Sequence, residues 1–584
     1  MKSNHSSSTV WGKNLLIGLA LILSASLAFA APRKMSKELD NQYSGNVDVI
    51  VQYTQVPTAA HHQKVFGRGG TLRRDLGEFK GGAYTMPASE VADLAADPEV
   101  VYISPDRPLQ SSKTNAVNDY HTEIVNAPAA WALGLNGTGI GVAVIDSGIA
   151  SIPDITASKI VYSQDFTGAG STADAYGHGT HVTGILAGNG SQSTGSNYSY
   201  TFKGIASGVS IINLRVLNAS GTGTDSEVIA AIQKAIALKS TYNIRVINLS
   251  LGRPVWESYS VDPLCQAVEQ AWKAGIVVVV AAGNYGRDNL SGTKGYGTIT
   301  APGNDPYVIT VGAMNTKGSS SSSIAVPTSY TSKGPTLVDN VVKPDIVAPG
   351  NLIDSLYFSA ATINQKNPGF EIPQSLYVTN GNSSSSTTYY ALSGTSMATP
   401  MVSAAAALML QQTPSLTPDQ VKARLMATAF KGLVQASTAT DLTTGQSFSE
   451  QADVFTVGAG LLNIEAALKN TNLAPSTAGS ALSPVAVKAC NGNVSLVAKG
   501  SSVLGGSSIL WGTSILWGTS ILWGTNSTTG ESILWGTSSP LTGSSILWGT
   551  NTESAESILW GSGTTQGSST DQGSTTEDVI NDLE

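Results

Sequence analysis

The sequence predicts an α/β fold in which a mostly parallel sheet is flanked by helices. Between residues 127 and 470, short apolar runs alternate with helical segments, the order typical of strands joined by crossover helices. The runs are apolar at nearly every position, which indicates strands covered on both faces. Asp146, Ser250 and Asn284 lie at or just past the ends of such runs. Because catalytic groups of open parallel sheets lie at the carboxyl ends of the strands, these residues are candidates for a functional site.

The composition excludes some classes of partner. The chain has 584 residues, which allows one large domain with appendages. Only 12% of the residues are charged, the formal net charge is -8, and Lys and Arg form no cluster. We therefore expect no nucleic acid partner.

Residues 1–30 have the pattern of a secretory signal peptide. Lys2 and Lys13 precede an uncharged, mostly apolar stretch over residues 15–27, and Ala28-Phe29-Ala30 predicts cleavage after Ala30. An uncleaved membrane anchor is the alternative, but the stretch is short for a span and ends in small residues. No later segment is long and apolar enough, so we expect an exported protein with no membrane span in the mature chain.

Residues 31–113 contain a second, smaller pattern. A strand-like run over 47–53 is followed by short strand-like segments near Leu72 and Ala83, a helix over 89–96 and a closing strand over 100–104. This order predicts a small α+β unit. The polar stretch over 107–118 is predicted to be a linker, the kind of segment that a protease cuts.

The large domain is predicted to extend over residues 114–472. Its expected strands and helices are justified by the apolar runs and by the periodic segments between them. The expected strands are 140–145, 209–216, 245–251, 276–281 and 307–311, and the expected helices are 225–237, 263–273, 396–411 and 418–429.

Residues 473–584 form a tail rich in Ser, Thr and Gly that contains a repeat. The unit Ser508-Ile509-Leu510-Trp511-Gly512-Thr513 recurs, and its tryptophans at 511, 517, 523, 535, 548 and 560 are separated by 6, 6, 12, 13 and 12 residues. All but one of these gaps preserve a six-residue register, and an even period keeps each side chain on one face of a strand, which predicts stacked strands or a hexapeptide solenoid. A flexible tail is the alternative, because Ser/Thr/Gly-rich spacers favour disorder.

The two cysteines, Cys265 and Cys490, fall in segments of very different composition. We expect two unpaired thiols, although a disulfide between them stays open. Their spacing predicts no metal site.

The segment with the most chemical content is Ser393 to Pro400, in which Ser396 lies between a Gly-rich turn and an apolar helix. A serine hydroxyl becomes a nucleophile only with a base and an orienting carboxylate. Asp146 ends an apolar run, and His178 or His181, three residues apart, supplies a base. Asn284 follows another strand and offers a neutral donor for a developing oxyanion.

Four segments together resemble the signatures of the subtilisin-like serine peptidases, in that family's Asp, His, Ser order. The segments are Val144 to Gly148, His178 to Gly184, Ala281 to Asn284 and Gly394 to Pro400. The resemblance implies that Ser396 is the nucleophile, His178 the general base and acid, Asp146 its orienting partner, and Asn284 the oxyanion donor. It selects His178 over His181, for which a packed helix position is the simpler expectation.

The resemblance also implies how a peptide binds. Two backbone edges would flank the substrate, one at Ser250-Leu251-Gly252 and one around Gly221 and Gly223, and main-chain hydrogen bonds to these edges accept any sequence. The pocket for the residue before the scissile bond would be lined by Ala281 to Gly283 and by residues 300–303. These residues are mostly small and uncharged, so an apolar preference is expected.

Two further features follow from the resemblance. Residues 31–113 resemble the inhibitor-type propeptide of the family, a ferredoxin-like unit that would bind its own enzyme, with cleavage expected between Arg107 and Ala116. No cofactor is expected for the chemistry. A structural calcium ion at Asp154 is possible by family habit, but the loop over 189–200 supplies no carboxylate for it.

The sequence thus predicts a secreted serine endopeptidase that acts on proteins or peptides through an acyl-enzyme and is matured by removal of its propeptide. The alternative is a secreted binding or surface-attachment protein that works through its Trp-Gly repeat tail.

Overall fold

The computed structural model describes residues 34–35, 39, 45–76, 80–105, 120–288, 293–366, 369–441, 445–488 and 494–500, together with four short strands of the tail. The predicted signal peptide, the predicted cleavage region from Arg107 to Ala116 and Cys490 lie outside these residues. The chain divides into two units, Met1–Gln110 and Ser111–Glu584.

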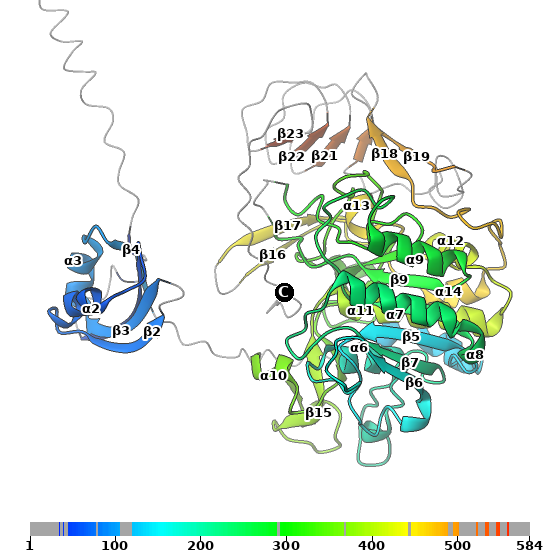
Figure 1. Cartoon of the computed structure of the whole chain (residues 1–584), viewed down its shortest axis with the longest axis horizontal. Coiled ribbons are helices and arrows are strands. Elements are labelled where there is room, and N and C mark those ends of the chain that lie inside the picture. Colours follow the sequence, from blue (N-terminus) through cyan, green and yellow to red (C-terminus); the bar gives the residue numbers. More distant parts are fainter. Residues whose placement is uncertain are drawn as a thin grey trace, which may run out of the picture. The chain divides into compact units, whose positions relative to one another are not determined.

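The first unit is a four-stranded antiparallel sheet with two helices (Figure 1). Its elements are β1 (Asn46–Tyr53), α2 (Ala59–Phe66), β2 (Thr71–Leu76), β3 (Gly81–Pro87), the 3-10 turn η3 (Ala88–Glu90), α3 (Val91–Ala95) and β4 (Val100–Pro105). The strand order is β2-β3-β1-β4. Alternate residues of β1, namely Val49, Val51 and Tyr53, are buried in the unit's own core. The period of two explains why this run forms a strand with one covered face.

The second unit is built on an eight-stranded sheet with the order β11-β10-β9-β8-β5-β7-β6, in which β12 also pairs with β10. Its strands are β5 (Gly141–Asp146), β6 (Ile160–Asp165), β7 (Ser210–Arg215), β8 (Ile244–Leu249), β9 (Val277–Ala281), β10 (Ile309–Asn315), β11 (Val326–Pro327) and β12 (Ile346–Pro349). Every pairing is parallel except that of β10 with β11. The predicted mostly parallel sheet is therefore confirmed.

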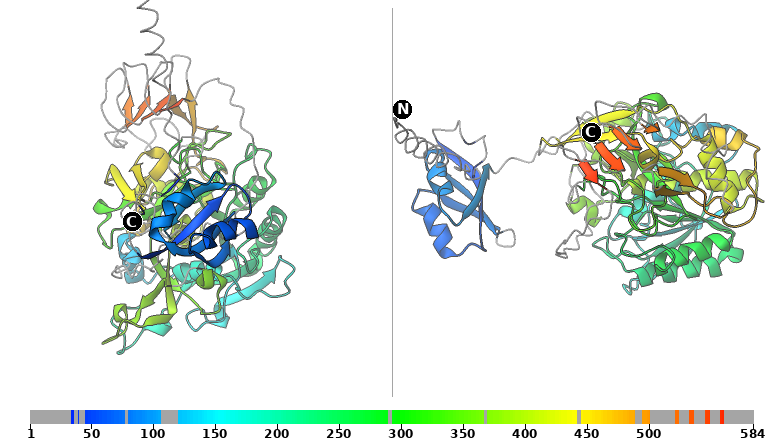
Figure 2. Two further views of the ribbon diagram at one scale, coloured as in Figure 1. Left: turned by 90° about the vertical axis from the view of Figure 1, so that its left-hand side faces the viewer. Right: turned by 90° about the horizontal axis from the view of Figure 1, so that it is seen from above.

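Several helices of the second unit cover this sheet, whereas α10 lies near β15 (Ser385–Leu392) and α13 near β17 (Ser447–Gln451) (Figure 1; Figure 2). The helices of the unit are α4 (His121–Ile124), α5 (Ala127–Ala132), α6 (His178–Ala187), α7 (Asp225–Ala237), α8 (Lys239–Tyr242), α9 (Pro263–Lys273), α10 (Thr362–Lys366), α11 (Thr395–Gln412), α12 (Pro418–Thr428), α13 (Val454–Val457) and α14 (Ile464–Lys469), with 3-10 turns η4 (Ala157–Lys159), η5 (Ser191–Ser193), η6 (Ser322–Ile324) and η7 (Gln374–Leu376). The long helix α11 packs on β8, β9, β10 and β12, and α6 lies beside it. In turn α7 and α9 pack on each other and on the strands β5, β8 and β9.

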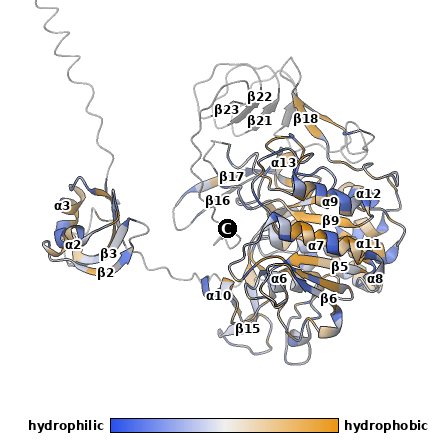
Figure 3. Ribbon diagram, in the orientation of Figure 1, coloured by the Kyte–Doolittle hydropathy of each residue, from blue (hydrophilic) through white to orange (hydrophobic). Residues whose placement is uncertain are grey.

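Burial explains the uniform hydrophobicity of the central strands. Every residue of β5 and of β9 is buried, and both strands are orange in Figure 3. Local signals then place the helices between them. Thr224 and Glu227 form a capping box at the start of α7, and Asp262 caps α9 through Leu264 N, with Pro263 in the first turn.

Three small sheets precede the repeats of the tail. They are β13 (Ile353–Leu356) with β14 (Glu371–Pro373) and β15 (Ser385–Leu392), the hairpin β16 (Ala436–Thr440) with β17 (Ser447–Gln451), and the pair β18 (Val485–Lys488) with β19 (Val494–Val497). In the tail, β20 (Ile521–Trp523), β21 (Ser532–Trp535), β22 (Ser545–Trp548) and β23 (Ser557–Leu559) pair in parallel with equivalent repeat positions in register.

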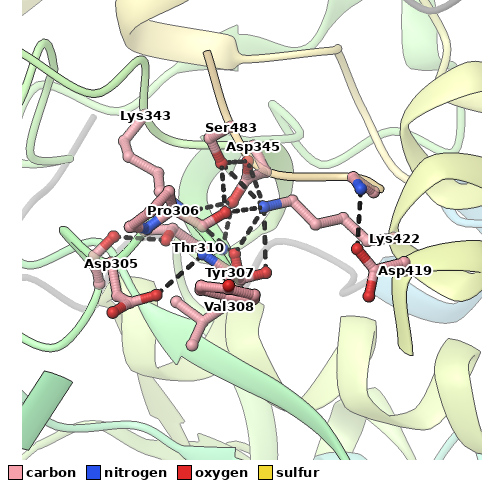
Figure 4. A network of polar contacts seen from close by, with 12 residues as sticks. Asp305, Pro306, Tyr307, Val308, Thr310, Lys343, Asp345, Asp419, Lys422 and Ser483 are labelled. Carbon is pink, nitrogen blue, oxygen red and sulfur yellow. Dashed lines mark hydrogen bonds and ion pairs between the residues drawn. The ribbon is translucent and has the colours of Figure 1, made fainter. Parts of the chain in front are cut away.

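The segment that follows α14 is joined to the large sheet by a buried ionic network (Figure 4). Lys422 Nζ on α12 contacts the carbonyl oxygens of Pro306 and Val308 at 2.8 and 2.9 Å, and Ser483 Oγ at 2.8 Å. Asp345 Oδ1 lies 3.2 Å from Lys422 Nζ and accepts a hydrogen bond from Ser483 at 2.5 Å. Ordered packing thus continues beyond residue 472, where the change in composition had suggested that the tail begins.

None of the helices within the described ranges has both the length and the hydrophobicity needed to cross a bilayer. Cys265 is a buried free thiol on α9 that donates to Asn304 Oδ1. Its pairing with Cys490 is left as a prediction because the second cysteine is not described.

Candidate active site

The first functional pair joins the end of β5 to the start of α6. Asp146 Oδ1 lies 2.8 Å from His178 Nδ1, and both side chains are buried. The same oxygen accepts the Ser147 amide at 2.7 Å, and the Asp146 carbonyl accepts Val216 N from the neighbouring strand. A carboxylate can only accept, so Nδ1 carries the proton and Nε2 is the basic nitrogen of the neutral ring.

Ser396 occupies the first turn of α11. The preceding N-cap residue Gly394 has φ 155°, a value that favours glycine, and Ser396 itself is only 2% exposed. Its Oγ donates to the carbonyl oxygen of Ser250, just past the end of β8, at 3.2 Å. Free backbone N–H groups at a helix start favour negative charge nearby.

A proline within α11 explains a second hydrogen bond between Ser250 and Ser396. Pro400 has no N–H, so the carbonyl four residues earlier, that of Ser396, has no helical donor. Ser250 Oγ donates to this carbonyl at 2.8 Å. The first turn of α11 is therefore held to the end of β8 by two hydrogen bonds that run in opposite directions.

Sequence reasoning missed the residues behind this link. Asn248 Nδ2 donates to Ser250 Oγ at 3.0 Å, and Ser403 Oγ donates to Asn248 Oδ1 at 2.8 Å. All three side chains are buried. The sequence contained a signal for both residues, because Asn248 lies in an apolar strand and Ser403 in an apolar helix. Buried polar groups at such positions need hydrogen-bond partners.

The orientation of the Asn284 amide follows from its contact with Thr395. Its Oδ1 accepts Thr395 N at 2.9 Å and Thr395 Oγ1 at 3.1 Å. A backbone N–H can only donate, so the atom facing it is the oxygen, and Nδ2 lies on the other side of the amide. The predicted donor is thus held one residue from Ser396.

Two of the predicted catalytic residues, Asn284 and Ser396, line a cleft whose volume, open solvent included, is about 1010 Å³, whereas Asp146 and His178 are not part of its lining. The lining includes Asn284 and Ser396 and the predicted substrate residues Gly221, Gly223, Leu251, Gly252, Ala281 and Gly283. Ser250 belongs to the same site through its bonds to Ser396.

Thr300 closes one compartment of the cleft. A Cβ added to Gly252 would come within 2.5 Å of Thr300 Oγ1, and one added to Gly283 within 2.6 Å of Thr300 Cγ2. Both positions therefore need glycine for space, and the compartment between them is small.

His181 lies one turn along α6 from His178 but is bound elsewhere. Its Nε2 lies 3.1 Å from Ile353 O and 3.0 Å from Tyr390 O, on β13 and β15. Burial lowers the pKa of His181 to about 3, so the ring is neutral at physiological pH. The ring serves to pack α6 onto this small sheet.

The calcium ion expected at Asp154 stays a prediction, and the structure shows which protein groups this carboxylate binds. Its Oδ1 accepts Ser191 Oγ and Gln192 N, each at 2.7 Å, and its Oδ2 accepts Tyr389 Oη at 2.9 Å. Both carboxylate oxygens are thus engaged by hydrogen-bond donors. In the part of the chain that the structure describes, no three His, Cys, Asp or Glu side chains gather into a group able to hold a metal.

The buried pair of His178 and Asp146 lies at the start of α6, and α6 packs on α11, the helix that carries Ser396. A serine, a histidine and an aspartate are the catalytic side chains of a serine peptidase. The subtilase family model matches residues 137–460. Among similar proteins, serine protease AprX of Bacillus subtilis (strain 168) is 37% identical over 317 residues, which cover 53% of this chain and 66% of AprX. Subtilisin E of the same strain is 32% identical over 462 residues, 78% of this chain and 97% of its own. Subtilisin DY of Bacillus licheniformis is 34% identical over 349 residues, 60% of this chain and 97% of its own.

The chain belongs to the subtilase family and is a serine endopeptidase.

Proposed function

We propose that this subtilase is a secreted enzyme that hydrolyses peptide bonds through Asp146, His178 and Ser396, with Asn284 as oxyanion donor. The observation that supports it most is the buried His178–Asp146 contact of 2.8 Å at the start of α6, which packs on α11, the helix that carries Ser396. A histidine held in this tautomer is ready to accept a serine proton.

The proposed reaction has two halves. Ser396 Oγ attacks the carbonyl carbon of the scissile bond and passes its proton to His178 Nε2, while Asp146 stabilises the imidazolium. Asn284 Nδ2 and the Ser396 N–H donate to the tetrahedral oxyanion. His178 then protonates the leaving amine, an acyl-enzyme forms on Ser396, and water activated by His178 releases the second product.

Hydrolysis of casein by the purified protein tests this function. Ser396→Ala is expected to lower kcat by about six orders of magnitude, the loss known for subtilisin itself. Equal activity of the wild-type protein and this variant would refute the proposed mechanism.

We further propose that residues 31–113 act as an inhibitor-type propeptide of ferredoxin-like fold. The β-α-β-β-α-β order of the first unit and its place between the predicted signal and the catalytic domain support this role. The proposal includes export, with removal of residues 1–30 and cleavage between Arg107 and Ala116. The tail would then stay with the secreted enzyme, or attach it to a surface.

The chemistry is proposed to need no metal. Because both carboxylate oxygens of Asp154 accept hydrogen bonds from protein donors, added chelator should leave the melting temperature of the mature enzyme within about 1 °C of its value in buffer. A drop of many degrees would show a structural ion.

A further inference from the structure

The cleft has a second compartment, whose lining differs in chemistry from the small one around Thr300. Its apolar part is formed by Leu217 and Val228, from the β7–α7 region, and by Leu251 and Leu264, from the β8–α9 region. Leu217, Val228 and Leu264 are 8%, 4% and 2% exposed, so these side chains are packed in the protein and form the base of the compartment.

An ion pair closes this compartment. Arg253 Nε lies 2.9 Å from both carboxylate oxygens of Asp225, and both residues line the cleft. Asp225 lies two residues after the predicted substrate edge at Gly223, and Arg253 directly follows the other edge at Gly252. The pair therefore joins the two edges between which a peptide would run.

Most hydrogen-bond donors of the Arg253 guanidinium are already used within the protein. A second carboxylate, Asp262, accepts Arg253 Nη2 at 2.9 and 3.0 Å, and Pro254 O accepts Nη1 at 3.2 Å. Interaction with Asp225 and Asp262 holds the pKa of Arg253 above its usual range. The backbone of Arg253 is also fixed, because it exchanges hydrogen bonds with Ala301.

Two carboxylates surround one guanidinium, so this group of three side chains carries a net charge of -1 (two minus one). Asp262 is fully buried, Arg253 is 24% exposed and Asp225 is 42% exposed. The negative charge is therefore presented to the cleft by Asp225. An apolar floor with a carboxylate at its edge suits a side chain that has an aliphatic stem and a cationic tip.

We propose that Asp225 makes this compartment a subsite for a lysine or arginine side chain of the substrate, at a position other than the one bound against Thr300. This inference rests on the proposed function, because it concerns the substrate of the same cleft. The stem packs on Leu217, Val228, Leu251 and Leu264, and the cationic group lies at the Asp225 carboxylate. Arg253 is a positioning residue that holds this carboxylate and partly offsets its charge.

The test uses quenched fluorescent peptides that are identical except for Lys, Met or Glu at one of the positions before the scissile bond. In the wild-type enzyme, kcat/KM should be about tenfold higher for Lys than for Glu at one position. That ratio should fall toward one in about 1 M salt, because salt screens a partly exposed charge. This measurement needs no variant.

Two substitutions separate charge from structural support. Both break the ion pair, yet Asp225→Asn should lower the Lys/Glu ratio severalfold, since it removes the negative charge, while Arg253→Gln should raise it. A matched control is Glu465→Gln, because Glu465 is also 42% exposed and paired with a single cation, Lys469, outside the cleft. Its ratio should equal that of the wild-type enzyme.

The outcomes are distinct. If both cleft variants shift the ratio in the same direction, or if the wild-type ratio is one at every position, the subsite is refuted while cleavage of the peptides still supports the proposed function. If the wild-type enzyme cleaves none of the peptides and no casein, the proposed function fails, and this inference with it.

Discussion

The proposed role of Asn284 depends on which atom of its amide faces the oxyanion. Its oxygen accepts the Thr395 N–H, so Nδ2 is the atom proposed to donate to the oxyanion. Asn284→Asp keeps an acceptor for Thr395 but replaces the donor with a charged oxygen. We expect kcat to fall by at least about 10² to 10³ with a small change in KM, the range that removal of this donor gives in subtilisin. Steady-state kinetics on one peptide checks this, and an unchanged kcat would contradict the role.

The histidines one turn apart on α6 differ because their surroundings differ. His181 is buried and neutral, with a pKa lowered to about 3 from an ordinary value of 6.5. Between these two values the unfolded chain binds a proton that the folded chain does not. His181 therefore leaves the free energy of unfolding at its full value above about pH 6.5. As the pH falls from there toward 3, the free energy of unfolding decreases by up to about 1.4 kcal/mol per pH unit.

Urea unfolding of the inactive Ser396→Ala protein at several pH values from 7 to 4 tests this prediction. His181→Gln keeps a donor near Ile353 and Tyr390 but does not titrate. We expect this variant to be less stable at pH 7 and to lose less stability on acidification. Parallel pH profiles for the two proteins would show that His181 does not contribute.

At the scale of elements, the ionic network at Lys422 holds the segment after α14. Lys422 Nζ joins α12 to the carbonyls before β10, to Asp345 and to Ser483. All of these atoms lie in buried side chains or main chain, so a lost partner leaves a buried charge or an unpaired carbonyl. This network, and not propensity, explains why a Ser/Thr/Gly-rich segment is ordered at this point.

Lys422→Met is expected to lower the free energy of unfolding by about 3–5 kcal/mol, because Asp345 then loses one of its two cations. Hydrogen exchange around residues 481–487 should speed up as well. Lys469→Met is the matched control: Lys469 is 70% exposed and bonded to Glu465, so about 0.5 kcal/mol or less is expected. Similar losses in both variants would argue against a buried anchor.

At the scale of the whole molecule, the elements with a regular hydrophobic pattern were predicted correctly, and elements that depend on packing were missed. The predicted helices over 225–237 and 263–273 coincide with α7 and α9, and the predicted central strands differ from the observed ones by one or two residues at most ends, except that β10 begins and ends later than expected. These elements could be read from the sequence because they are periodic or uniformly apolar. The strand β6 and the sheet of β13, β14 and β15 were not predicted. Exposed positions interrupt β6 and β15, and β13 is buried throughout but contains the polar residues Asp354 and Ser355.

Some residues of the candidate site were also predictable from the sequence, and others were not. Two of the four motifs, Ala281 to Asn284 and Gly394 to Pro400, contribute residues to the cleft, and the other two supply the buried Asp146–His178 pair. The bond from Ser403 to Asn248 and the bond from Ser250 to Ser396 each join residues more than 140 positions apart. Such contacts follow from how α11 packs on β8, which no local pattern contains.

The division of the chain at Gln110 falls within the predicted linker, so the last prediction concerns how the precursor becomes the enzyme. If the enzyme processes itself, the wild-type protein should be recovered with a new N-terminus between Arg107 and Ala116. The Ser396→Ala protein, purified alone, should keep its full precursor mass after removal of the signal peptide, because its nucleophile is missing. A trace of active enzyme added to this variant should then cut it at the same place, since the linker itself is unchanged. N-terminal sequencing and intact-mass measurement follow all three reactions. A Ser396→Ala protein that loses residues 31–113 without added enzyme would place the processing activity in another protease.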